Sequence, residues 1–256
     1  MKAMILAGGF GTRLAEETNV RPKPMVEIGG KPILWHIMSH YFKHGISEFV
    51  ICLGYKGDYI KKFFLDYAPT MSNFTIDLST QKLDIHELKA ESWKVTLVDT
   101  GLKTMTGGRI KRAIHHLVPD EPFCLTYGDG LSDVDITKSI AFHQSHGKLA
   151  TVTAVTPPGR FGVLDIKKNS CVVGFREKIA SDQYRINGGF FVLNPAIKEY
   201  IENDQSVWEQ EPLLQLAENN ELRSWMHDGF WQPMDTLRDK KILEELWNTG
   251  YPPWRV

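Results

Sequence analysis

The sequence predicts an α/β fold: a mostly parallel Rossmann-like sheet flanked by helices, with a small additional β region. Short apolar runs typical of buried strands alternate with longer segments whose apolar residues recur at helical spacing. Glycines follow the first apolar run directly, as they do where a parallel strand ends at a ligand crevice. With no internal repeat and no low-complexity linker, residues 1–256 should form one domain, ending in a helix and tail over residues 236–256.

The first half of the chain has a β-α-β-α order. Residues 3–6 form a buried strand, and Pro32 and Gly45 mark the start and end of a helix, because proline suits the first helical position and glycine the position after the last. Residues 49–53 form the next strand. The second helix should bury a stripe made of Tyr59, Ile60, Phe63, Phe64 and Tyr67.

Short alternating runs over residues 74–76, 83–85 and 95–97 predict strand pieces that cover or flank the sheet. Gly107-Gly108 should then precede a helix over residues 109–118, which leads to a strand over residues 123–127. The later elements are predicted as strands over residues 150–156, 162–166 and 190–193 and helices over residues 209–217 and 236–247.

Composition excludes several classes of protein. Hydrophobic residues make up 42% and charged residues 24%, with a net charge of −1, so neither disorder nor nucleic-acid binding is indicated. No run approaches 18 apolar residues, so we expect no membrane span. Cys52, Cys124 and Cys171 are far apart in apolar runs, which predicts buried thiols in a reducing compartment, the cytoplasm.

The segment Leu6-Ala7-Gly8-Gly9-Phe10-Gly11-Thr12-Arg13-Leu14 has the character of a phosphate loop. Glycine amides can approach phosphate oxygens without a Cβ in the way, and Arg13 and Lys23 would add positive charge. It is not a Walker loop, because no Lys-Ser or Lys-Thr pair follows, and Leu14 replaces the third glycine of the dinucleotide fingerprint. The alternative is a glycine turn after an edge strand.

Three histidines and the tryptophans have simpler explanations than ligand binding. His36, His40 and His44 lie four apart on one helix, but no H-E-x-x-H pattern accompanies them. We expect them on a polar face opposite the apolar stripe. The seven tryptophans should pack the late helices or a subunit interface.

Through nearly the whole chain, the sequence resembles the sugar-1-phosphate nucleotidyltransferases. The resemblance rests on the glycine segment and on motifs at Arg21-Pro22-Lys23-Pro24-Met25, Gly30-Lys31-Pro32, Tyr127-Gly128-Asp129, Glu177-Lys178, Asn187-Gly188-Gly189 and Asp235. It implies the nucleotide-diphospho-sugar transferase fold and Mg²⁺ held by Asp129 and Asp235. It also implies that Arg13 neutralises the departing pyrophosphate and that Lys23 lies against the phosphate under attack.

The resemblance also assigns the substrate-binding residues. It implies sugar-phosphate binding by Glu177, Lys178 and Asn187-Gly188, with Gly162 letting the hexose lie close to the chain. The family's usual Glu-Lys-Pro has Ile179 in place of proline here, which affects the local backbone more than Lys178. The nucleotide-binding set is Leu6, Ala7, Gly8, Gly9, Gly11, Thr12, Arg13, Lys23, Thr104, Arg109 and Gly128.

The chemistry of such a transfer agrees with the residues present. Two polyanions must be joined, so charge neutralisation and positioning matter most. The attacking phosphate has a second pKa of about 6 and is already ionised, so no general base is needed. Asp129 and Asp235 suit Mg²⁺, which takes one or two carboxylates. The alternatives are an Asp-Gly turn for Asp129 and a helix N-cap for Asp235.

The base is indicated by a departure from the family pattern. Residues 104–109, Thr-Met-Thr-Gly-Gly-Arg, replace the segment usual in thymidylyl and uridylyl relatives, while residues 208–212 and 230–236 are most similar to the cytidylyl branch. That branch implies CTP, α-D-glucose 1-phosphate, a homo-oligomer (a hexamer) and a place in surface polysaccharide synthesis such as lipopolysaccharide. Cytosine offers an amino donor, so an acceptor such as a backbone carbonyl near Leu6 or Thr104 is required.

Two alternatives stay open. The same chemistry with UTP or dTTP, or with another hexose 1-phosphate, would need only a different base or sugar reader. A regulator that binds nucleotide sugars without turnover is the other alternative, although the cationic and carboxylate positions that such regulators often lose are all present here.

Overall fold

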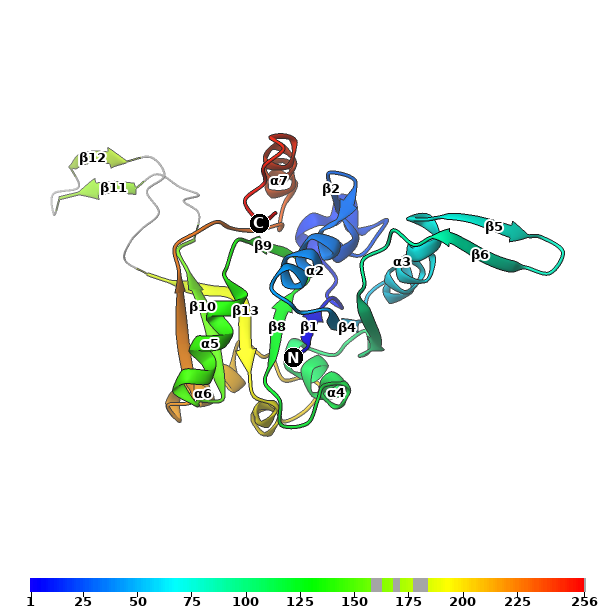
Figure 1. The fold of residues 1–256 in the computed structure, drawn as a ribbon. Helices are drawn as coiled ribbons and strands as arrows, with labels where there is room; N and C mark the ends of the chain where they lie inside the picture. Colours follow the sequence, from blue (N-terminus) through cyan, green and yellow to red (C-terminus); the bar gives the residue numbers. More distant parts are fainter. Residues whose placement is uncertain (158–162, 168–170, 177–183, 256) are drawn as a thin grey trace.

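The computed structural model describes residues 1–157, 163–167, 171–176 and 184–255 of the chain. A seven-stranded sheet forms its centre (Figure 1). Across the sheet the strands are β14 (Leu222–His227), β10 (Ala150–Val155), β13 (Ile186–Leu193), β8 (Phe123–Tyr127), β1 (Ala3–Leu6), β4 (Glu48–Leu53) and β7 (Lys94–Asp99).

The sheet is mostly parallel, as predicted. Strand β1 pairs in parallel with β4 and β8, β4 with β7, and β10 with β14, whereas β13 runs antiparallel to both β8 and β10. Leu6 is in register with Cys52 on one side and Tyr127 on the other. The segments that follow β1 and β8 therefore emerge side by side at one edge of the sheet.

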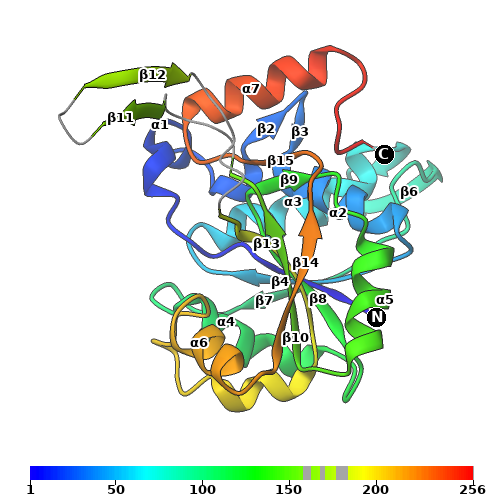
Figure 2. The ribbon, with the colours of Figure 1, turned by 90° about the vertical axis from the view of Figure 1, so that its left-hand side faces the viewer.

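Helices cover both faces of the sheet (Figure 2). Successive strand residues point to opposite faces. Ile5 packs in the cluster that includes Ile37, whereas Met4 packs in the cluster that includes Ile110. The helices are α1 (Ala15–Thr18), α2 (Ile33–Lys43), α3 (Gly57–Thr70), α4 (Thr106–Ala113), α5 (Ile136–His146), α6 (Glu211–Glu218) and α7 (Leu237–Asn248). Helices α2 and α7 contribute to the first cluster, and α4 and α6 to the second.

Four short two-stranded ribbons complete the fold. They are β2 (Glu27–Ile28) with β3 (Lys31–Pro32), β5 (Asn73–Asp77) with β6 (Lys82–Glu87), β9 (Gly130–Ser132) with β15 (Trp231–Pro233), and β11 (Val163–Ile166) with β12 (Val172–Arg176). Within the part of the chain that the structure describes, no helix combines the length and apolar composition needed to cross a membrane.

The region between α3 and β7 differs from the prediction. Strands β5 and β6 do not cover the sheet; they pair with each other and project from the body as an arm, while β7 joins the edge of the sheet (Figure 1). The predicted stripe on α3 is only partly buried, because Ile60 and Tyr67 are buried but Tyr59 is 42% exposed. Local alternation predicted the strands correctly but could not show what lies beside them.

Helix α4 starts earlier than predicted, at Thr106, so Gly107 and Gly108 lie inside the helix. Both glycines allow a close approach of the segment around Ser206. A Cβ on Gly107 would lie 2.7 Å from the Ser206 carbonyl oxygen, and a Cβ on Gly108 would lie 2.6 Å from the Asp204 Cα. The glycine pair is therefore a packing feature.

The prediction of a polar histidine face is wrong for His36 and His40, which are only 2% and 3% exposed. The C-terminal tail covers this part of α2: Trp254 Nε1 donates to His36 Nδ1 at 3.3 Å, while His36 Nε2 lies 2.8 Å from the Ile28 carbonyl oxygen. Burial lowers the pKa of both histidines to about 4, so they stay neutral. Among the described residues, no group of three His, Cys, Asp or Glu could hold a metal ion.

The cysteines agree with the prediction in two cases out of three. Cys52 and Cys124 are buried, and burial raises the pKa of each thiol to about 12. Cys171 is exposed, which corrects the prediction for that residue, because an apolar neighbourhood in sequence does not guarantee a covered position.

Candidate active site

The glycine loop after β1 is held by the neighbouring strand and helix. The Gly8 carbonyl accepts hydrogen bonds from the Tyr55 N–H at 3.1 Å and from Arg109 Nη2 at 3.0 Å. A Cβ on Gly8 would lie 2.2 Å from Arg109 Nη1, and Gly11 has a φ of +65°. These two glycines are required by the protein itself.

For Gly9, no contact within the described protein requires a glycine. A Cβ built there meets no heavy atom within 4 Å, so this residue faces open space. No described residue accepts a hydrogen bond from the backbone N–H groups of residues 9–13. A run of N–H donors without protein acceptors beside a glycine is the arrangement that anions such as phosphate occupy.

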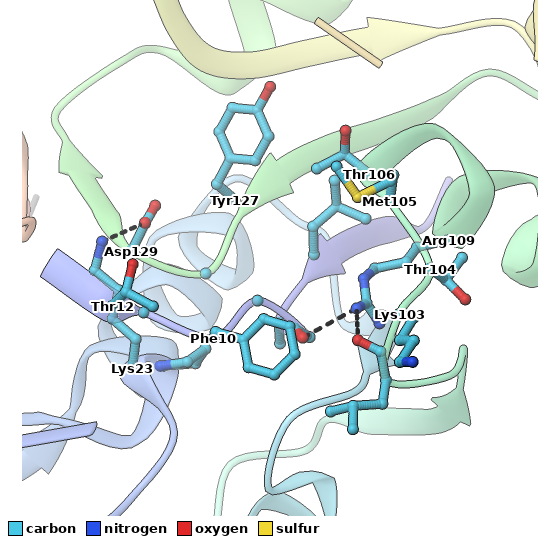
Figure 3. Close-up of a pocket in the computed structure, with 18 of the residues that line it drawn as sticks. Phe10, Thr12, Lys23, Lys103, Thr104, Met105, Thr106, Arg109, Tyr127 and Asp129 are labelled. Atoms are coloured by element: carbon cyan, nitrogen blue, oxygen red, sulfur yellow. Dashed lines mark hydrogen bonds and ion pairs between the residues drawn. The ribbon is translucent and has the colours of Figure 1, made fainter. Parts of the chain in front are cut away.

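This loop forms one wall of a hollow of about 370 Å³ (Figure 3). Residues 102–106 with Arg109 form the opposite wall, and residues 127–129 close one end. Every predicted nucleotide-binding residue lines this single hollow, although the set comes from four separate segments of the chain.

Arg109 joins the two walls rather than facing the hollow with a free guanidinium. It is 5% exposed, and it donates to the carbonyl oxygens of Gly8 at 3.0 Å, Leu53 at 3.0 Å and Gly101 at 2.8 Å. Because these guanidinium donors are used on backbone carbonyls, Arg109 shapes the hollow by fixing its walls.

Lys23 lies between the two predicted metal ligands. Its Nζ is 2.7 Å from Asp129 Oδ2 and 2.7 Å from Asp235 Oδ1, and Arg13 Nη1 is 2.8 Å from Asp235 Oδ2. Lys23 is only 7% exposed, so it is not a solvated surface cation. Burial acts to lower the pKa of Lys23, but the charges and hydrogen bonds of the two aspartates outweigh it and raise that pKa.

Asp235 reaches the site through the ribbon of β9 and β15. Trp231 pairs with Ser132, and the Met234 N–H donates to the Asp129 carbonyl at 2.8 Å. Thr236, not Asp235, is the N-cap of α7, and it forms a capping box with Asp239. The N-cap interpretation of Asp235 is therefore wrong. Asp129 does lie in a tight turn, between β8 and β9, and its carboxylate still points to Lys23.

The carboxylates of Asp129 and Asp235 have the chemistry for one Mg²⁺ and lie close to each other. One oxygen of each contacts the same ammonium group, so the two oxygens lie within about two hydrogen-bond lengths of each other. Magnesium binds through one or two carboxylates and completes its octahedron with water and phosphate oxygens. The residues present fit such an ion.

A second hollow adjoins the first. Asn187, Gly188, Glu209 and Trp231 line it, and four residues line both hollows: Arg13, Thr106, Tyr127 and Asp129. Two of the predicted sugar-phosphate residues thus lie beside the aspartates. The other three, Gly162, Glu177 and Lys178, lie outside the described residues.

Sequence reasoning did not select Thr106, Tyr127, Glu209 or Trp231 as site residues. Tyr127 stood in a motif of the resemblance, next to Asp129, and Glu209 and Trp231 stood in the segments most similar to the cytidylyl branch. Those segments were the available signal, but only the fold shows that they border the same hollow.

A glycine loop and paired carboxylates at one edge of a mostly parallel sheet define a nucleotide-binding transferase. Residues 2–232 match the family model described as nucleotidyl transferase, and the chain belongs to that family. It is 57% identical to glucose-1-phosphate cytidylyltransferase of Salmonella typhimurium, over 100% of this chain and 99% of that protein. It is 44% identical to the probable glucose-1-phosphate cytidylyltransferase of Bacillus subtilis, over 100% of both chains.

A solved structure supports the fold independently. The crystal structure of HddC from Yersinia pseudotuberculosis has a TM-score of 0.71 and is 25% identical, covering 96% of this chain and 99% of that one. The match covers nearly the whole of both chains, so the two proteins share their fold.

Proposed function

We propose that this protein transfers the cytidylyl group of CTP to α-D-glucose 1-phosphate, giving CDP-glucose and pyrophosphate. The observation that carries the proposal is the 57% identity, over the whole chain, to a relative named for this reaction. The geometry supports it, because a nucleotide hollow and a sugar hollow meet at Arg13 and Asp129.

The nucleotide occupies the first hollow in this proposal. Its phosphates lie against the free N–H groups of residues 9–13, and Arg13 neutralises the departing pyrophosphate. The cytosine amino group donates to a backbone carbonyl, for which Leu6 and Thr104 are suitable because both line that hollow.

The sugar phosphate enters from the second hollow and attacks the α-phosphorus directly, without a covalent intermediate. Its oxygen is already ionised at neutral pH, so no side chain has to accept a proton. Lys23, which stays protonated, lies against the phosphate under attack, and Lys178 holds the sugar phosphate. Glu177, Asn187 and Gly188 bind the hexose, and Gly162 lets it lie close.

We further propose Mg²⁺ as the metal, with Asp129 and Asp235 as its protein ligands. When bound, the ion neutralises charge on the phosphates and fixes their orientation. Two carboxylates within reach of one cation support this assignment.

Pyrophosphate release tests the base and sugar assignments. The purified protein is incubated with Mg²⁺, glucose 1-phosphate and each of CTP, UTP and dTTP, then with CTP and other hexose 1-phosphates. We expect the highest kcat/KM with CTP and glucose 1-phosphate. A higher value with UTP or dTTP would contradict the cytidylyl assignment, and binding without pyrophosphate release would favour a regulator.

We also propose a homo-oligomer, a hexamer, in which a second copy covers the arm of β5 and β6. Phe74 is paired with Ile85 and Ile76 with Leu83, so one face of the arm is apolar, and all four side chains are 38–48% exposed. An isolated two-stranded ribbon is marginally stable in water, so a cover for this face would stabilise it.

Two further parts of the proposal concern organisation and context. Residues 1–256 are treated as one domain, because Leu243 of α7 and Trp254 of the tail belong to the same apolar cluster as Ile5 of the central sheet. We place the reaction in the cytoplasm, where CDP-glucose would supply the synthesis of surface polysaccharide such as lipopolysaccharide.

A further inference from the structure

Glu209 lines the second hollow beside Thr106 and Tyr127, two residues that line both hollows. Its Oε2 accepts a hydrogen bond from Thr106 Oγ1 at 2.6 Å, and its Oε1 accepts one from the Tyr127 hydroxyl. Thr106 Oγ1 in turn accepts from the Trp208 N–H at 2.9 Å. The carboxylate is therefore oriented by the start of α4 and by the end of β8.

The segment that carries Glu209 is fixed just as tightly. The Met105 N–H donates to the Asp204 carbonyl at 2.8 Å, and the Gly108 N–H donates to the Ser206 carbonyl at 3.3 Å. The bonds of Thr106 with Trp208 and Glu209 put the two stretches that set this sequence apart, residues 104–109 and 208–212, in direct contact. A carboxylate anchored at both ends is preorganised rather than free to swing.

Part of the carboxylate remains available to a ligand. Glu209 is exposed and lines the second hollow. A carboxylate has about four acceptor positions, and the two hydroxyl groups use two of them. Among the described residues, no lysine or arginine forms an ion pair with Glu209. The Glu209 carboxylate can therefore accept a further hydrogen bond, and a sugar hydroxyl is a neutral group that can donate one.

The surroundings suit a hexose. Trp231 lines the same hollow, and its Nε1 donates to the Gly188 carbonyl at 2.7 Å, which holds the indole in place. Burial, followed by the charge of Glu209, raises the pKa of Tyr127, so its hydroxyl stays protonated and keeps donating. Fixed acceptors beside an aromatic ring can bind a sugar by its hydroxyl and C–H groups together.

We propose that Glu209 accepts a hydrogen bond from a hydroxyl group of the hexose and thereby helps determine which hexose 1-phosphate is used. This inference rests on the proposed function, because it takes the second hollow to be the sugar subsite. Thr106 and Tyr127 act as positioning residues for this contact, since their hydroxyl groups orient the carboxylate.

The test begins with Glu209→Gln, which keeps the shape and removes the charge. A lost hydrogen bond to a charged group predicts a rise of about tenfold to hundredfold in the KM for glucose 1-phosphate. The KM for CTP should change by less than about twofold, because the proposed contact is made to the hexose. Glu211→Gln is the matched control, because Glu211 is exposed and, among the residues that the structure describes, its side chain accepts from Gln215 of its own helix alone.

Monodeoxy analogues of glucose 1-phosphate identify the hydroxyl. For the wild-type protein, kcat/KM should be lower with the analogue that lacks the bonded hydroxyl than with glucose 1-phosphate. For Glu209→Gln, kcat/KM should be nearly the same with that analogue as with glucose 1-phosphate, because the hydrogen bond is already absent. If every deoxy analogue lowers kcat/KM by the same factor in both proteins, or if the KM for CTP rises as much as that for the sugar, Glu209 does not bind the hexose. Failure of the proposed function is recognised separately, as absence of turnover by the wild-type protein with CTP and glucose 1-phosphate.

Discussion

The Met234 N–H donates to the Asp129 carbonyl at 2.8 Å, which joins two segments that lie about a hundred residues apart in the chain. This bond extends the ribbon of β9 and β15 and places Asp235 next to Asp129. Lys23 then contacts both carboxylates. The candidate metal site is therefore built on backbone pairing, which brings the two aspartates together.

Replacing Asp235 by asparagine should lower kcat by about two orders of magnitude or more, because it removes a proposed metal ligand and keeps the shape. The thermal midpoint should change little, since the ribbon is held by backbone bonds. Steady-state kinetics over a range of Mg²⁺ concentrations measure the effect. Asp228→Asn is the control, because Asp228 is exposed and pairs with Arg185. Near-normal turnover would remove Asp235 from the site.

Two glycines of the loop should respond differently to alanine. Gly9→Ala meets no protein atom, so it should leave the thermal midpoint unchanged and raise the KM for CTP by about tenfold or more, since the new methyl group intrudes on the phosphates. Gly8→Ala should cost about 1–3 kcal/mol in the free energy of unfolding, because its Cβ would lie 2.2 Å from Arg109 Nη1. Calorimetry on both variants measures the change in stability, and steady-state kinetics measures the KM for CTP. Equal effects on stability would contradict this division.

Stability should fall in mild acid because of three buried histidines. Burial lowers the pKa of His36, His40 and His143 to about 4. In the unfolded chain, the pKa of a histidine is about 6.5. At a pH between about 4 and 6.5, the unfolded chain therefore binds more protons than the folded protein, and the free energy of unfolding decreases as the pH falls. By pH 4, each histidine should have lowered the free energy of unfolding by on the order of 3 kcal/mol relative to pH 7.

Denaturant unfolding at pH 7, 6 and 5 measures this dependence. His40→Gln removes one titrating group and can still donate to the Val134 carbonyl, so its stability should depend less steeply on pH. A slope equal to that of the wild-type protein would show that His40 does not stay neutral in the folded state.

The arm should control the oligomeric state. Replacing Ile76 and Leu83 together by lysine puts two charges on the apolar face of the ribbon, so we expect dissociation into smaller species. Size-exclusion chromatography with light scattering gives the mass. Thr75→Lys, on the other face, is the control and should leave the assembly intact. An unchanged mass for the double variant would place the subunit contact elsewhere.

Local sequence patterns were sufficient for much of the fold. The apolar run at residues 3–6, the proline and glycine around α2, and the strand ending before Asp129 each depend on neighbouring residues only, and the structure agrees with them. The reaction and the family were predicted from motifs, and the comparisons with known proteins agree with both.

Other features depend on contacts between distant segments, which periodicity does not encode. Helical spacing could not show that Trp254 covers His36, nor that the alternating runs of β5 and β6 leave the sheet. The sequence also could not show that Arg109, a predicted nucleotide-binding residue, donates to backbone carbonyl oxygens on both walls of the hollow.

The sequence by itself predicted the glycine loop after β1, the order of strands and helices up to β8 and the class of reaction, because each follows from residue types at short spacing. It did not predict α5 or β14. Only the tertiary structure decided that Glu209 lines the second hollow and that Asp235 lies next to Asp129. The positions of Glu209 and Asp235 depend on backbone contacts between segments far apart in the chain. The packing of the whole chain selects the partner of each short segment, and the few residues of that segment do not.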